Sequence, residues 1–201
     1  KSAAISGYAL VASELDKFKS FTDSLSGSSA FNVSSDTSAI GVSVSNQADA
    51  KPFNAKISVS SLAQSQTLEF GGFSSKTDAI NTGSITLDFG SWSGSTFTVN
   101  SEKSANVIAV TSSNNTLTGL AESLSALDGV NATVTDKGDG TFSLIINSDT
   151  GEKNALRMTV SEDSSDPGLS DFDTSTNNSS KQVVAASDAS ININGVTVTR
   201  T

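Results

Sequence analysis

The sequence contains neither cysteine nor histidine in its 201 residues. Without thiols or imidazoles it forms no disulfide, no zinc site built from these ligands and no nucleophile activated by histidine. It also has only one Met, one Trp, one Tyr and two Pro, and charged residues make up 16% of it. The missing Cys and His therefore exclude cysteine nucleophiles, histidine general bases, and metal sites built on thiolates or imidazoles.

Positive charge is scarce as well. Twelve Lys and Arg stand against 21 Asp and Glu, which gives a formal net charge of −9 at pH 7. This balance disfavours binding to phosphate backbones, so nucleic acid is not an expected partner. No apolar run approaches the roughly 20 residues of a membrane-spanning helix, so we expect no membrane partner. The chain has neither a start Met nor a signal peptide, and we expect it to be a segment of a longer protein.

Small polar residues take the place of the missing charges. Ser, Thr and Asn together number 76 of the 201 residues. Thr is favoured on pleated sheet surfaces, whereas Ser and Asn are favoured in turns. The composition therefore predicts an acidic, mainly β protein with a few helices, long enough for one large domain or two small ones.

Residues 3–25 have the period of a helix. Their apolar side chains recur at alternating spacings of three and four, at Tyr8, Val11, Leu15, Phe18 and Leu25. Two interpretations stay open. The segment is either an amphipathic helix that packs on its own domain, or one strand of a coiled coil whose partners lie outside the chain.

From residue 31 onward the apolar period is two, which is typical of antiparallel strands with one buried face. The alternating segments and one further strand are residues 40–44, 53–59, 85–89, 97–99, 106–111, 130–134, 142–146 and 156–160. One helix interrupts them at residues 117–127, where the leucines share one face. Asn115 or Thr116 is expected to cap this helix, and Gly129 to end it.

The last forty residues combine a loop signal and a hairpin signal. Residues 161–181 hold five acidic residues and Pro167, which predicts a solvated loop or linker. Asn194-Gly195, between two alternating runs, is the strongest hairpin signal in the chain. We expect the apolar side chains of both runs to point to one core: Ile191, Ile193, Val196 and Val198.

Acidic residues supply two weak candidates for calcium binding. Asp136-Lys137-Gly138-Asp139-Gly140 has some likeness to an EF-hand loop, but its twelfth position is Asn147, which lacks the required carboxylate. A plain hairpin turn is the favoured interpretation. For residues 162–173 a solvated acidic loop is likewise favoured over a calcium site. We predict no metal site and no cofactor.

Motifs that support catalysis are missing. No Ser stands in a G-x-S-x-G frame, and the glycines at 71–72 and 138–140 do not form a phosphate-binding loop. No pair of carboxylates has the pattern of a glycosidase. We therefore predict that the protein is not an enzyme and has no catalytic residues.

Three segments in order resemble one known family. Residues 57–68 resemble the "V-x-x-L-A-Q-x-Q-x-L" strand of bacterial flagellar filament cap proteins, the hook-associated cap proteins. Residues 117–160 resemble the repeat of flagellin-like head domains, and residues 189–200 resemble the family's "L-x-I-N-G-x-x-I-x-R" hairpin. The resemblance covers nearly the whole chain, and is least distinctive at residues 70–105 and 161–188.

The resemblance implies a head-domain fragment of α+β class, mainly β, with two antiparallel head domains. Residues 1–30 would be a stub of the helical leg. Residues 31–70 and 178–201 would form an inner head domain, and residues 71–177 an outer domain inserted into it. No catalytic residue is carried over from the family.

The resemblance also implies a function. A cap sits at the tip of the extracellular filament, where it promotes folding and polymerisation of secreted flagellin and acts as a ring-like homo-oligomer. Flagellin and other copies of the protein are the expected partners, and an adhesion role with host glycans is a further expectation. The alternatives are a flagellin or hook–filament junction head domain, and a glycan-binding or host-binding adhesin.

Overall fold

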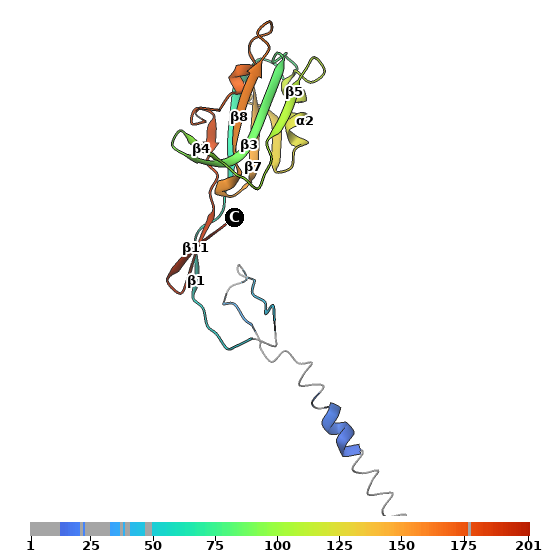
Figure 1. Ribbon diagram of the computed structural model, residues 1–201, viewed down its shortest axis with the longest axis vertical. Helices are drawn as coiled ribbons and strands as arrows, with labels where there is room; N and C mark the ends of the chain where they lie inside the picture. Colours follow the sequence, from blue (N-terminus) through green and yellow to red (C-terminus); the bar gives the residue numbers. More distant parts are fainter. Residues whose placement is uncertain are drawn as a thin grey trace, which may run out of the picture. The chain divides into compact units, whose positions relative to one another are not determined.

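The computed structural model describes residues 13–20, 22, 33–36, 38, 41–46, 50–176 and 178–201. The chain divides into two units, Lys1–Ala55 and Lys56–Thr201. Almost all of the regular structure belongs to the second unit (Figure 1). No helix in these described ranges has the length and apolar character needed to cross a membrane.

The described part of the first unit contains a helical segment. Residues 13–20 and 22 are helical, as predicted for residues 3–25, and the rest of that prediction lies outside the described residues. Two side chains of the predicted apolar stripe, Leu15 and Phe18, are 67% and 64% exposed.

One predicted strand, residues 40–44, is absent where the structure describes it, and another, residues 53–59, begins later than predicted. Residues 41–44 and 53–56 are not in strand conformation, and Ile40 lies outside the described residues. Alternating side chains favour a strand, but the backbone forms one only where a neighbouring strand supplies its hydrogen bonds. Regular pairing begins at β1, Ile57–Ser61.

A small sheet of three antiparallel strands has the order β1-β10-β11. β10 is Ala189–Ile193 and β11 is Val196–Arg200. The predicted hairpin is confirmed, because Ile193 pairs with Val196 and Ile191 with Val198. Its turn needs two positive φ angles, which are 52° at Asn194 and 90° at Gly195.

The remaining strands form two further antiparallel sheets. One has the order β6-β7-β2-β9. In the other, β3 pairs with β8 along one edge and with β5 and then β4 along the opposite edge. Their bounds are β2 Ser65–Phe73, β3 Gly83–Ser93, β4 Thr96–Val99, β5 Asn106–Val110, β6 Val130–Asp136, β7 Phe142–Thr150, β8 Ala155–Glu162 and β9 Gln182–Val184. The mainly β fold with antiparallel sheets is thus confirmed.

Helix α2, Leu117–Ser125, forms where the leucine spacing predicted it. Of the two candidate caps it uses Thr116, whose side chain accepts a hydrogen bond from the backbone N–H of Gly119 at 3.0 Å. The helix ends at Ser125 with Ala126 as its C-cap, so the expectation that Gly129 ends it is wrong; Gly129, with a φ of 77°, lies in the turn before β6. A fully buried leucine face results, which presses α2 onto the sheets.

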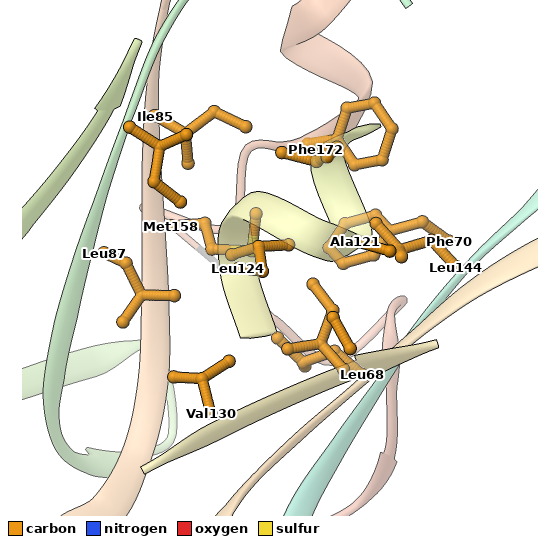
Figure 2. Close-up of a cluster of buried hydrophobic side chains, with 14 of the residues drawn as sticks. Leu68, Phe70, Ile85, Leu87, Ala121, Leu124, Val130, Leu144, Met158 and Phe172 are labelled. Atoms are coloured by element: carbon orange, nitrogen blue, oxygen red, sulfur yellow. The ribbon is translucent and has the colours of Figure 1, made fainter. Parts of the chain in front are cut away.

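The core lies between the two larger sheets and beneath α2 (Figure 2). Leu68 and Leu144 come from one sheet, Leu87 and Met158 from the other, and Leu124 from α2; all five are 0% exposed. Each strand therefore keeps its apolar face inward, as the period of two requires.

The prediction of a solvated loop at residues 161–181 is wrong in part. Leu169–Phe172 forms a 3₁₀ turn, η2, and both Leu169 and Phe172 are 0% exposed. The Phe172 ring lies 5.2 Å from that of Phe70 and 5.7 Å from that of Phe73. Two isolated apolar residues among many Ser and Asp give no measurable period. The sequence therefore did not reveal that η2 packs against the core.

Candidate functional site

The turn at residues 136–140 uses its carboxylates for itself. Asp136 accepts a hydrogen bond from the backbone N–H of Gly138 at 2.8 Å. Asp139 accepts from both the backbone N–H and the hydroxyl of Thr141, which lowers the pKa of Asp139. This is the hydrogen bonding of an Asx turn, and the turn joins the paired strands β6 and β7, which agrees with the plain hairpin turn favoured from the sequence.

An ion pair fastens this turn to the sheet. Lys137 Nζ lies 2.7 Å from Glu69 Oε1 on β2. The Ser143 hydroxyl donates to the same oxygen at 2.9 Å. The hydrogen bonds from Lys137 and Ser143 lower the pKa of Glu69. Sequence spacing alone gave no sign of this contact, because the partners are 68 residues apart.

The acidic residues of segment 162–173 likewise bind backbone groups. Glu162 accepts from the N–H of Gly168 at 3.0 Å and of Ser170 at 3.2 Å, and these bonds lower its pKa. Asp163 accepts from the N–H of Ser165 at 2.9 Å. In the part of the chain that is described, no three Asp or Glu side chains group in a way that could hold a metal ion.

Asp173 seals the free edge of β8. Its carboxylate accepts from the Val160 N–H at 2.9 Å and from the Ser175 N–H at 2.8 Å. Burial raises the pKa of Asp173, but the hydrogen bonds from Ser175 and Val160 outweigh it, so that the pKa is lowered. Next to it, Thr174 donates its N–H to the Met158 carbonyl and accepts from the Met158 N–H. This edge of β8 is therefore closed to other strands.

A buried amide network joins the two larger sheets. The Gln66 side chain is 0% exposed, and its carbonyl accepts the N–H of Leu156 on β8 at 2.6 Å. Its amide donates to Gln182 Oε1 at 2.7 Å, and Asn178 donates to the same oxygen at 2.9 Å. Gln66 belongs to the family-like segment 57–68, but nothing in its spacing predicted that it crosses between sheets.

The outward face of the β3–β4–β8 sheet carries an aromatic and charged cluster. The rings of Trp92 and Phe97 are 4.9 Å apart. The Arg157 guanidinium lies 4.7 Å from the centre of the Phe97 ring and 2.8 Å from Asp88 Oδ2. Trp92 Nε1 donates to the Leu156 carbonyl at 3.1 Å. We call Asp88, Trp92, Phe97 and Arg157 the outer-face cluster.

Phe97 fits against the sheet because residue 90 has no side chain. A Cβ at Gly90 would lie 2.1 Å from the Thr98 carbonyl oxygen and 2.7 Å from Phe97 Cζ, which is too close for any other residue. Gly90 also lines a surface hollow of about 230 Å³, together with polar residues such as Asn100, Glu102 and Lys153. The hollow is shallow and polar, whereas binding pockets for small molecules are mostly apolar.

The small sheet exposes apolar side chains. Val59, Ile193 and Val196 are 47%, 36% and 64% exposed, and they share a face with Ile191 and Val198. The strand pairing thus places the hairpin side chains on one face, as expected. We also expected this face to be buried in a core, but within the described residues it is partly exposed.

Comparison with known proteins gives a consistent result, although no family model matches the chain. The chain is 30% identical over 199 residues to flagellar hook-associated protein 2 of Escherichia coli O157:H7, a match that covers 98% of this chain and 41% of that protein. It therefore spans about two fifths of the length of its curated relatives.

Solved structures agree. The D2–D3 domains of the flagellar cap protein FliD from Escherichia coli are 29% identical with a TM-score of 0.58, over 73% of this chain and 72% of that one. The D2–D3 domains of FliD from Serratia marcescens are 25% identical with a TM-score of 0.58, over 76% and 80%. In both sequence and fold, the chain is thus similar to the D2–D3 part of these proteins.

Proposed function

We infer that the chain is the head region of a flagellar filament cap, because it corresponds to the D2–D3 domains of flagellar cap proteins. The observation that carries this inference is the similarity to hook-associated protein 2 along 98% of the chain. It agrees with the resemblance stated from the sequence, and it favours a cap over the flagellin and hook–filament junction alternatives. The role is structural, with no catalytic step.

At the filament tip, outside the cell, this head region would cover the site where flagellin subunits fold and join the filament. Flagellin and further copies of the same protein are the proposed partners. The surface suits such a role, because its Ser, Thr and Asn residues make polar, exchangeable contacts that are individually weak. A subunit that must move on as the filament grows benefits from contacts of this kind.

The sequence led us to expect a leg stub at residues 1–30, an inner domain from residues 31–70 and 178–201, and an outer domain at 71–177 inserted into it. We propose the same organisation with revised boundaries between the two head domains. The pairing of β1 with β10, and of β10 with β11, supports an insertion, because β2 to β9 lie between β1 and β10 in sequence. Since β2 runs unbroken from Ser65 to Phe73, we place the crossings slightly outside the expected boundaries, near residues 62–64 and 185–188.

Deletion of the gene in its source organism tests the function. We expect cells without filaments that release flagellin monomers into the medium, and restoration of filaments by the intact gene. A matched control restores the gene with the codons for residues 56–201 removed. Filaments of normal length in the deletion strain, or full rescue by the control gene, would refute the proposal.

Adhesion is a second candidate function, favoured by the outer-face cluster. Trp92 and Phe97 are partly exposed on this face, and an aromatic ring offers a large apolar surface against which the C–H face of a sugar can pack. A glycan array with the purified chain would show binding that Trp92→Ala abolishes and that Val107→Ala, a change at an exposed position on β5, leaves intact. An array without any bound glycan would remove this candidate.

A further inference from the structure

The tip of the β10–β11 hairpin carries the sequence Asn194-Gly195, which is the chain's only Asn-Gly pair. In such a pair the backbone nitrogen of glycine readily attacks the side-chain carbonyl of asparagine, because no Cβ hinders its approach. An open, mobile Asn-Gly pair is therefore prone to spontaneous loss of its amide.

In the folded hairpin both reacting groups are already held by hydrogen bonds. The Gly195 N–H donates to Asn192 Oδ1 at 2.8 Å, which restrains the nitrogen that would attack. The Asn194 side-chain oxygen accepts the N–H of Lys56 at 2.8 Å, and the Asn194 N–H donates to the Lys56 carbonyl at 2.9 Å. The side chain that would be attacked is thus fixed to the residue that precedes β1.

We propose that Asn194 is a deamidation site that the native hairpin protects and that opening of the hairpin exposes. In the reaction, a bond forms between the Gly195 nitrogen and Asn194 Cγ, the bond from Cγ to the amide nitrogen breaks, and ammonia leaves. Water then opens the resulting succinimide to aspartate or isoaspartate. The overall change consumes one water and releases one ammonia, with no oxidation or reduction.

The two products differ in what they do to the hairpin. Aspartate at position 194 keeps an oxygen that accepts the Lys56 N–H. Isoaspartate instead routes the backbone through the side-chain carbon and lengthens the turn by one methylene. A two-residue turn with positive φ at both positions does not accommodate that extra atom. Isoaspartate therefore keeps the hairpin from closing again, and a reversible opening becomes permanent.

The experiment follows amide loss at Asn194 by peptide mapping during incubation of the 201-residue chain in mildly alkaline buffer. It compares the native protein, the protein in urea, and three variants: Asn192→Ala, Asn192→Asp and Thr197→Ala. Asn192→Ala removes the acceptor for the Gly195 N–H, whereas Asn192→Asp retains one. Thr197 is the strand partner of Asn192, so Thr197→Ala controls for a general loosening of the hairpin.

We expect slow loss in the native protein and fast loss in urea. Asn192→Ala should react about fivefold faster than the native protein, the factor that corresponds to one hydrogen bond of ~1 kcal/mol. Asn192→Asp and Thr197→Ala should stay near the native rate. The proposal is overturned if the native protein reacts as fast as it does in urea. It is also overturned if Asn192→Ala and Asn192→Asp react at the same rate, because the two variants differ in whether residue 192 offers an acceptor to the Gly195 N–H.

Discussion

Gln66 connects two sheets through a fully buried side chain. Its carbonyl satisfies a backbone N–H of β8, and its amide satisfies Gln182 next to β2. Buried polar groups are stable only when hydrogen-bonded. Removal of the Gln66 amide would therefore leave both the Leu156 N–H and the Gln182 side chain without a hydrogen-bond partner they now have.

Gln66→Leu should lower the free energy of unfolding by about 1–3 kcal/mol, the cost of leaving a buried N–H unsatisfied. The apolar replacement is similar in size, so lost volume does not explain such a change. Urea denaturation measures it, with Gln64→Leu as the matched control at an exposed position two residues away. Equal stability of the two variants would show that the amide network contributes nothing.

Asp173 gives a prediction about pH. Its pKa is lowered in the folded protein, so its carboxylate stabilises the fold above the ordinary value of about 3.9, and that stabilisation is lost as the pH falls through the lowered pKa. Asp173→Asn should lose less stability than the native protein between neutral and acid pH. Thermal melts across that range measure the difference, and Asp171→Asn, at an exposed neighbour, should follow the native curve. Parallel curves for native protein and Asp173→Asn would contradict the assignment.

At the scale of elements, local patterns predicted what local contacts determine. The leucine period and Thr116 predicted α2, and Asn194-Gly195 predicted the β10–β11 hairpin. β9 has three residues, and η2 has four, which is too short for any period to appear. Both form because the surrounding sheets pack against them. Their own residues do not encode those contacts, so the sequence could not predict them.

Phe172→Ala tests whether η2 belongs to the core. The truncation removes a ring that is fully buried against Phe70 and Phe73, and it should cost about 3–5 kcal/mol of stability. Asp171→Ala in the same turn is exposed and should change stability by less than about 0.5 kcal/mol. Chemical denaturation of both variants decides the question, and a small effect at Phe172 would restore the interpretation of a solvated loop.

At the scale of the whole molecule, the sheet order was beyond sequence analysis. β2 lies between β7 and β9, partners that follow it by dozens of residues, and alternation shows which face is buried but not which strand is adjacent. The same limit hid the outer-face cluster, whose members Asp88 and Arg157 meet across β3 and β8. Long-range pairing is a property of the assembled fold.

Calcium should not change the stability of the chain. The carboxylates of the 136–140 turn and the 162–173 segment already accept hydrogen bonds from their own backbone, and binding an ion would break these. Melting temperatures with calcium and with EDTA should coincide. A clear rise with calcium would locate a site in one of these two segments.

The isolated chain should be largely monomeric at low concentration. Its net charge of −9 causes repulsion between copies, which salt screens over a Debye length of about 10 Å at 0.1 M. Light scattering over a series of concentrations and salt levels should show weak association that strengthens with salt. A tight oligomer at sub-micromolar concentration, unaffected by salt, would mean that the chain itself carries the assembly interface.

The two connections into the larger domain run side by side, because Gln64 and Ser187 exchange backbone hydrogen bonds of 2.8 and 3.1 Å. This pairing has a mechanical consequence. A tensile load applied between residues 57 and 200 reaches the strands of the small sheet and the Gln64–Ser187 pair before it reaches the two larger sheets. Because the chain enters and leaves the two larger sheets at this one pair, these sheets carry almost none of that load. Under tension the small sheet therefore unfolds first, while the two larger sheets stay folded.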